Sequence, residues 1–207
     1  MTLKTARIAA FAALGLAVLI SAAAYLYWHR EGGSSAAPSA GLTAIGGPFT
    51  LTDQNGRAVS GQDFRGKLML VYFGYTFCPD ACPTALLQMG QALDRLGPGG
   101  EAVQPVFITI DPARDTQEQL KTYASNFHPR LVALTGTKEE TAQAAKSYRV
   151  YYAKQKAETT TEYLVDHSSI IFLMGRDGRY LTHFSHGSPP SAIAAELRKR
   201  LGPGNGV

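Results

Sequence analysis

Residues 67–83 read KLMLVYFGYTFCPDACP, an apolar run that leads directly into two closely spaced cysteines. The apolar part, residues 68–73, is continuous, which is typical of a strand buried on both faces of a sheet. Cys78 and Cys82 follow the end of this strand, and a helical pattern begins at residue 84. Ligands of open α/β sheets bind outside the carboxyl ends of the strands, so the cysteines occupy the position of a functional site.

The segments around this stretch alternate between strand and helix patterns. A hairpin is predicted where residues 49–51 and 58–59 flank the turn sequence DQNG at 53–56. Further strands are predicted over residues 103–110, 131–134, 169–174 and 180–184, and helices over residues 84–96, 116–127, 137–148 and 190–201. This alternation predicts an α/β fold with a mixed sheet flanked by helices, and the order of the elements is thioredoxin-like.

The first 30 residues are predicted to form a single-pass membrane anchor. Residues 8–28 are almost entirely apolar and carry no charge, and as a helix they would span about 30 Å, the thickness of a hydrocarbon core. Lys4 and Arg7 precede this run, which keeps the N-terminus cytoplasmic and places the rest on the periplasmic side of the inner membrane. A cleaved signal peptide is the alternative, because residues 21–24 are small, but the apolar run exceeds the usual hydrophobic region of a signal peptide, about 7–15 residues.

The remainder divides into a linker and one domain. Residues 31–47 are rich in Gly, Ser and Ala and predict a flexible linker, and residues 48–202 form the predicted thioredoxin-like domain. The net charge of +4 is carried in part by the N-terminal segment. The one basic cluster beyond it, residues 198–200, lies in the last turn of a predicted helix, where cations complement the helix dipole. No nucleic-acid partner is therefore expected.

The two cysteines predict chemistry, because a pair so close in sequence does not cross-link distant parts of a small fold. A helix N-terminus stabilises thiolates, and residues four apart in a helix lie about 6 Å apart along the axis, so Cys78 and Cys82 can converge on one ion or form a disulfide. Two thiolates are too few for the usual zinc site or iron–sulfur cluster, so copper with one added imidazole fits best. The alternative is an inert or simply disulfide-bonded pair.

Three segments together resemble the Sco/SenC family: GYTFCPDACP at 74–83, ITIDPARDT at 108–116 and VDHS at 165–168. They occur in the family's order, and the resemblance covers about residues 45–201. It implies a thioredoxin-like fold behind one N-terminal anchor, with Cys78, Cys82 and His167 as ligands of one copper ion, Cu(I) or Cu(II). It also implies a role in assembling the dinuclear copper site of cytochrome c oxidase.

The place of His167 in the sequence agrees with this role. It opens the strand that enters the apolar run at Ser169, a region that faces the cysteine motif in thioredoxin-like folds. His29, His128, His183 and His186 are expected at surfaces or in loops. The polar stretch 154–162 is predicted to be a mobile loop that lets His167 close onto copper and release it.

Two carboxylates near the predicted ligands are candidates for an outer shell that orients or tunes them. Asp80 lies between the cysteines and fits equally well as a helix cap. Asp166 precedes His167, but adjacent side chains of a strand point apart, so a contact with the imidazole depends on the backbone.

The leading function is a metallochaperone, with no catalytic residue and no conventional enzyme activity. Its partners would be a copper donor or thiol reductant that the sequence does not identify and the copper-accepting subunit of cytochrome c oxidase, to which it would pass copper. The second hypothesis is a dedicated thiol–disulfide oxidoreductase, in which Cys78 and Cys82 form a redox-active disulfide that reduces the cysteines of that subunit. A thiol peroxidase is disfavoured. The motif of that family has Thr or Ser three residues before its cysteine, and here Tyr75 and Pro79 occupy those positions. A copper or redox sensor stays open.

Overall fold

The computed structural model describes residues 15–16, 18–22, 24–25, 45–155 and 163–202. The chain divides into two units, Met1–Thr43 and Ala44–Val207. The described residues of the first unit are helical and exposed. Within the described parts of the chain, no helix is long and apolar enough to cross a membrane. Much of the predicted anchor and nearly all of the predicted linker lie outside the described residues, so both stay predictions.

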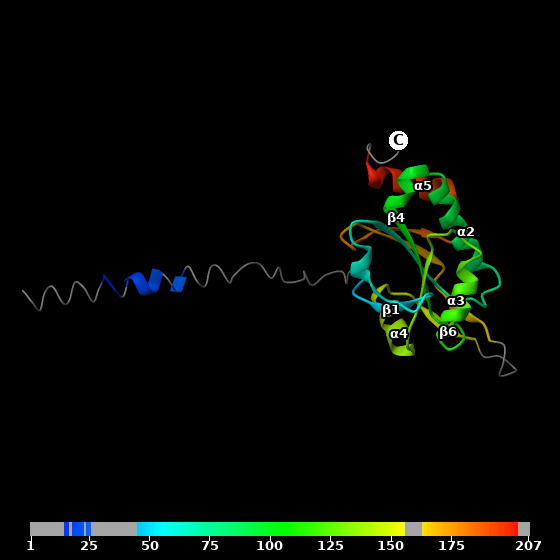
Figure 1. Ribbon diagram of the computed structural model, residues 1–207, viewed down its shortest axis with the longest axis horizontal. Helices are drawn as coiled ribbons and strands as arrows, with labels where there is room; N and C mark the ends of the chain where they lie inside the picture. The colour runs from blue at the N-terminus through cyan, green and yellow to red at the C-terminus, as the bar shows by residue number, and fades with distance from the viewer. Residues whose placement is uncertain (1–14, 17, 23, 26–44, 156–162, 203–207) are drawn as a thin grey trace, which may run out of the picture. The chain divides into compact units, whose positions relative to one another are not determined.

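The second unit is built on a seven-stranded mixed sheet with four α-helices (Figure 1). The sheet contains β1 (Thr50–Asp53), β2 (Ala58–Ser60), β3 (Leu68–Gly74), β4 (Val103–Thr109), β5 (Val132–Thr135), β8 (Ile170–Met174) and β9 (Tyr180–Ser185). The helices are α2 (Ala81–Asp94), α3 (Gln117–Ala124), α4 (Lys138–Ser147) and α5 (Pro190–Leu201), with 3₁₀ turns η1 (Gly61–Phe64) and η2 (Gly97–Ala102). A separate two-stranded ribbon pairs β6 (Tyr152–Lys154) with β7 (Val165–His167).

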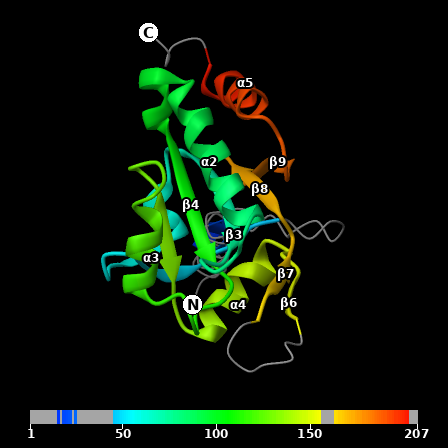
Figure 2. The same ribbon diagram turned by 90° about the vertical axis from the view of Figure 1, so that its right-hand side faces the viewer.

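The strand order is β2-β1-β5-β4-β3-β8-β9, with β3, β4 and β5 parallel to one another and the other neighbours antiparallel. All seven residues of β3 are buried, as its unbroken apolar sequence predicts. The predicted mixed sheet flanked by helices is therefore confirmed, and the fold is thioredoxin-like. In Figure 2 the arrow of β4 points to the end of the sheet where β6 and β7 lie.

The core fills both faces of the central strands. Phe73 contacts Tyr148 at the end of α4, with ring centroids 5.1 Å apart, and Phe107 contacts Tyr123 of α3 at 5.7 Å. Helix α2 buries an apolar face that includes Leu86, and it packs against α5 (Figure 1). Burial of these large side chains is the main force that holds the helices to the sheet.

Most predicted elements are present within a few residues of their expected ends. The capping box at the start of α4 is confirmed, because Thr137 Oγ1 accepts from Glu140 N–H at 3.1 Å and the Glu140 carboxylate accepts from Thr137 N–H at 2.8 Å. The helix predicted from residue 84 begins earlier, at Ala81. Pro83 is tolerated there because the first turn of a helix has no internal partner for its N–H groups.

The ribbon β6–β7 was not predicted. The predicted loop 154–162 begins inside β6, and its residues 156–162 lie outside the described part of the chain. His167 ends β7 and does not open the strand that follows, since β8 begins separately at Ile170. The prediction that His167 opens the apolar strand is therefore wrong, although the residue does lie beside the cysteines as expected.

Candidate metal centre

The two cysteines lie at the carboxyl end of β3, where the chain turns into α2. Cys78 is half-buried in the turn, and its N–H donates to the Tyr75 carbonyl at 3.3 Å. Cys82 lies in the first turn of α2 and is completely buried. Both are free thiols. Only the Cys78 sulfur is therefore open to an approaching group.

Gly74 makes room for the buried sulfur. A Cβ atom at this position would lie 2.6 Å from Cys82 Sγ, closer than such atoms approach in proteins, and in tight contact with the Phe107 ring at 3.0 Å. The last residue of β3 is a glycine because the Cys82 side chain occupies the space beside it.

His167 completes a compact group of three potential metal ligands. Its Nε2 lies 3.4 Å from Cys82 Sγ, and the three candidate ligand atoms of Cys78, Cys82 and His167 all lie within 4.8 Å of one another. Among the described residues this is the one cluster of three or more histidine, cysteine or carboxylate side chains with such geometry. The structure thus brings together all three residues that the sequence predicts as ligands, from two segments of the chain that are far apart in sequence.

Two tyrosines of the cysteine-bearing segment hold the imidazole edge-on. The Tyr72 and Tyr75 ring centroids lie 6.0 Å and 5.9 Å from that of His167, at interplanar angles of 81° and 85°. The Tyr75 hydroxyl also accepts a hydrogen bond from Val165 N–H at 3.2 Å, which fixes the strand that carries the histidine. Neither contact was predicted, since Tyr72 fits the expected buried strand and Tyr75 lies in the cysteine motif without a sign of this role.

The two thiols share one proton. The pKa of Cys78 is lowered to about 3, first because the Cys82 thiol donates to its sulfur and further because His167 and the backbone N–H groups of Asp80 and Cys82 also stabilise the thiolate. The pKa of Cys82 is raised, first by the same hydrogen bond and then by burial. Cys78 is therefore the thiolate and Cys82 the thiol at neutral pH.

The Tyr72 hydroxyl lies in the same buried environment. Burial is the main cause that raises its pKa, and the neighbouring Cys82 adds to it. Within the described residues this hydroxyl has no hydrogen-bond partner of ordinary geometry. The Tyr72 hydroxyl can therefore donate to the Cys82 sulfur once that sulfur loses its proton and becomes an acceptor.

A buried carboxylate fixes the cysteine loop to the central sheet. Asp115 accepts hydrogen bonds from Thr76 N–H at 3.0 Å, Thr76 Oγ1 at 2.7 Å and Thr109 Oγ1 at 2.6 Å. Burial is the largest influence on its pKa, which is raised, although the hydrogen bonds act in the opposite direction. Asp115 belongs to the segment ITIDPARDT at 108–116, and its structural role was not predicted from the sequence.

The two predicted outer-shell carboxylates point elsewhere. Asp80 is the N-cap residue of α2, but its side chain accepts from Thr84 Oγ1 at 3.3 Å, and its backbone N–H is what stabilises the Cys78 thiolate. The Asp166 carboxylate accepts from Gln155 Nε2 at 2.7 Å instead of facing the imidazole, because adjacent side chains of a strand alternate. The His167 Nδ1 lies 3.3 Å from the Ser168 carbonyl oxygen.

Two of the other described histidines, His128 and His183, have partners of their own. His128 lies 3.7 Å from an Asp94 carboxylate oxygen, and His183 Nδ1 lies 2.6 Å from the Tyr180 hydroxyl. Neither belongs to the cysteine cluster.

Comparisons with known proteins give a consistent match. The family model described as SCO1/SenC matches residues 37–202. The human mitochondrial protein SCO1 homolog is 41% identical over 165 residues, which covers 79% of this chain and 55% of the human protein. Protein SCO1 homolog 1 of Arabidopsis thaliana is 45% identical over 165 residues, with 79% of this chain and 49% of that protein covered. The chain thus spans about half the length of these two relatives.

A solved structure matches the same part of the chain. Bradyrhizobium japonicum ScoI, solved with copper bound, is 44% identical with a TM-score of 0.71, and the match covers 76% of this chain and 99% of the other.

Proposed function

Since this chain belongs to the SCO1/SenC family, we propose that it is a copper metallochaperone that assists assembly of the dinuclear copper site of cytochrome c oxidase. The observation that carries the proposal is the convergence of Cys78, Cys82 and His167 within 4.8 Å. The copper-bound ScoI of B. japonicum, which matches nearly over its whole length, supports the same cargo.

The donor set fits copper. Two sulfurs and one imidazole nitrogen are ligands that soft or borderline copper ions prefer, whereas a structural zinc site requires four protein ligands. No fourth histidine, cysteine or carboxylate joins the cluster among the described residues. Three protein ligands leave a coordination position free for exchange with a donor or an acceptor.

The two sulfurs have different parts in loading. Cys78 is already a thiolate and is half-exposed, so it meets the incoming ion first. Cys82 then gives up its proton and becomes the second sulfur ligand, and His167 Nε2 closes the site from β7. Because Cys82 is completely buried, a partner's cysteine or histidine must begin the exchange at the side of Cys78.

We place the domain on the periplasmic side of the inner membrane, held by residues 1–30 as a single-pass anchor and by a linker over 31–47. The support for this is the uncharged apolar run of residues 8–28 with Lys4 and Arg7 before it. The copper-accepting subunit of cytochrome c oxidase would then meet the domain on the same side of the membrane, as would the copper donor.

A thiol–disulfide oxidoreductase is the second candidate, and the acidity of Cys78 favours it. The Cys78 thiolate would attack a disulfide of the acceptor, forming a mixed disulfide and releasing one acceptor thiol. Cys82, after losing its proton, would attack the Cys78 sulfur and release the second acceptor thiol. Two electrons would pass to the acceptor, and Cys78–Cys82 would become the disulfide.

A transfer experiment separates the two functions. The full chain in detergent, reduced and loaded with one copper, is mixed with the reduced copper-accepting domain of a cytochrome c oxidase, and copper on each protein is measured after separation. In parallel, the copper-free reduced chain is mixed with the oxidised acceptor, and acceptor thiols are counted. A chaperone transfers copper in the first mixture. Thiol formation in the second mixture without copper transfer in the first would favour the oxidoreductase.

A further inference from the structure

A cluster of charged and aromatic side chains lies beside the metal centre and contains none of its predicted ligands. At its centre is Asp111, which follows β4 and is 1% exposed. Its carboxylate accepts from the Tyr163 hydroxyl, with both oxygens at 2.8 Å, and from Arg114 Nε at 2.5 Å. Lys154 Nζ lies 3.5 Å from the same carboxylate. The buried Asp111 carboxylate thus contacts two cationic side chains and one hydroxyl.

Tyr163 is held by further contacts from both cations. The Arg114 guanidinium lies 3.7 Å from the centre of the Tyr163 ring, and its Nη1 donates to the Tyr163 carbonyl at 2.9 Å. Lys154 Nζ lies 4.1 Å from the ring centre and donates to the Tyr163 hydroxyl at 2.9 Å. Such cation–π and charge-assisted contacts are stronger than neutral ones, particularly where water is excluded.

The ribbon depends on these side chains for its position. β6 and β7 pair with each other and belong to no other sheet among the described residues, so no ladder of backbone hydrogen bonds ties them to the main sheet. Lys154 is the last residue of β6, and Tyr163 lies shortly before β7, at the end of the ribbon opposite His167. The cluster therefore attaches the ribbon at this end, whereas Val165 is buried in the core and the Tyr72 and Tyr75 rings contact His167 at the other.

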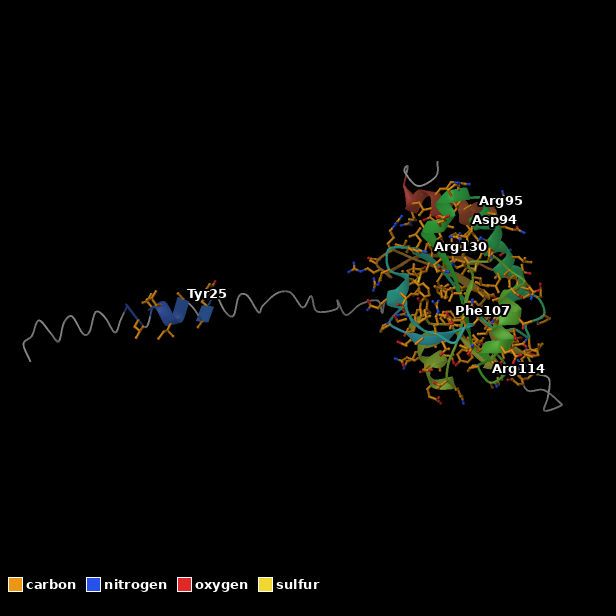
Figure 3. All side chains as sticks on the ribbon, viewed as in Figure 1. Tyr25, Asp94, Arg95, Phe107, Arg114 and Arg130 are labelled. Carbon is orange, nitrogen blue, oxygen red and sulfur yellow. The ribbon has the colours of Figure 1, made fainter. Side chains whose placement is uncertain are left out.

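Arg114 connects the two ligand-bearing segments. Its guanidinium lies 4.8 Å from the ring of Phe77, the residue before Cys78, as well as over Tyr163. Arg114 lies at the end of the second unit where β6 is drawn (Figures 1 and 3). Its side chain is 17% exposed, so these contacts are largely shielded from water.

We infer that Tyr163, Asp111 and Arg114 are positioning residues that hold His167 against the cysteine pair and set how readily it leaves copper during transfer. This inference rests on the proposed function. If the cluster loosens, the ribbon spends more time away from the cysteines and the fraction of protein with a complete site falls, which weakens binding by that fraction. Copper then leaves through a site with two sulfur ligands, and release becomes faster.

Tyr163→Phe tests this with little change in volume. It keeps the ring under Arg114 and Lys154 but removes the hydroxyl on Asp111, a hydrogen bond to a charged group. We expect a competing chelator to remove copper about tenfold faster from this variant. Tyr151→Phe is the matched control, since Tyr151 adjoins the same ribbon but is 67% exposed. Thermal unfolding of each variant verifies that it is folded.

A double-mutant cycle shows whether the effect passes through His167. Tyr163→Phe is repeated in the His167→Ala background of the full chain, with copper-release rates measured in all four proteins. We expect no acceleration in that background, because the ligand that the cluster positions is gone. An equal acceleration in both backgrounds, or a release rate of Tyr163→Phe that matches Tyr151→Phe, overturns the inference.

A readout without metal keeps the inference separate from the proposed function. Amide hydrogen exchange at Val165, whose N–H donates to the Tyr75 hydroxyl, is compared in copper-free protein, and we expect faster exchange in Tyr163→Phe than in Tyr151→Phe. Unchanged exchange overturns the positioning role even if copper binds. If the wild-type chain binds no copper, the proposed function fails, and the exchange result still decides whether the cluster holds the ribbon.

Discussion

Gly74 shows how closely the end of β3 is fitted to the metal centre. The Cys82 sulfur occupies the volume that any larger residue at position 74 would fill, with the Phe107 and Tyr72 rings on its other sides. The sequence motif contains this glycine, but the reason for it is the packing of a sulfur from another element. That reason is a tertiary contact, which a linear pattern does not reveal.

Gly74→Ala should therefore damage the site. The added methyl group must displace the Cys82 sulfur or the aromatic rings, and overpacking of this kind costs about 1–3 kcal/mol of unfolding free energy. We expect weaker copper binding together with a lower urea midpoint. Gly90→Ala in α2 is the control, because it makes the same change away from the sulfurs and should leave copper binding unaltered. Normal copper affinity in Gly74→Ala would show that the sulfur is not confined as described.

The shared proton of the two cysteines predicts a particular pH dependence. The pKa of Cys78 is lowered to about 3, so this thiol is already deprotonated at neutral pH and releases no proton when metal binds. The pKa of Cys82 is raised, so its proton is present in the copper-free protein and must leave on binding. Copper affinity should then rise about tenfold per pH unit between about pH 7.5 and 8.5, measured against a chelator of known protonation. A hundredfold rise per unit would mean that both thiols are protonated in the free protein.

At the scale of elements, the loop that carries the cysteines is tied to β4 by Asp115. Its carboxylate has three donors from Thr76 and Thr109, so the cysteine loop and the segment after β4 are held as one body. This connection positions Cys78 without touching it.

Asp115→Asn should disturb this connection. The NH₂ group of the asparagine would face Thr76 and Thr109 groups that also donate. Each buried hydrogen-bonding group left unpaired costs about 1–3 kcal/mol of unfolding free energy. We expect a lower urea midpoint and weaker copper binding. Asp63→Asn is a suitable control, since Asp63 is an exposed carboxylate in η1 that likewise accepts from backbone N–H. If Asp115→Asn unfolds at the same midpoint as the Asp63 control, the carboxylate does not hold the loop.

The sequence predicted the strands of the main sheet and missed the ribbon β6–β7 for a physical reason. β3 is an apolar run, β4 is mostly apolar, and α4 has both halves of a capping box, so local pattern and tertiary structure agree there. β6 and β7 have three residues each, too few for a period to be recognised, and they are stabilised by contacts with distant residues such as Asp111. His167 was therefore predicted beside the cysteines but on the wrong strand.

At the scale of the whole molecule, the site lies where two parts of the chain that are far apart in sequence meet. The turn after β3, the start of α2 and the end of β7 each contribute one potential ligand, and Cys82 and His167 are 85 positions apart in sequence. A complete site therefore exists only in the folded domain. The motif resemblance predicted which residues would meet, whereas the tyrosines and the Asp111 cluster that support them became visible only in three dimensions.

The measurement that tests the central claim most directly is an anaerobic copper titration of the reduced full chain in detergent, with a competing chelator, for wild type and His167→Ala. We predict one copper per wild-type chain and an affinity that falls by about a hundredfold or more in the variant, since a direct ligand should contribute at least as much as the residues that support ligands. Binding of equal strength in both proteins, or no stoichiometric binding by the wild type, would contradict the three-ligand copper site.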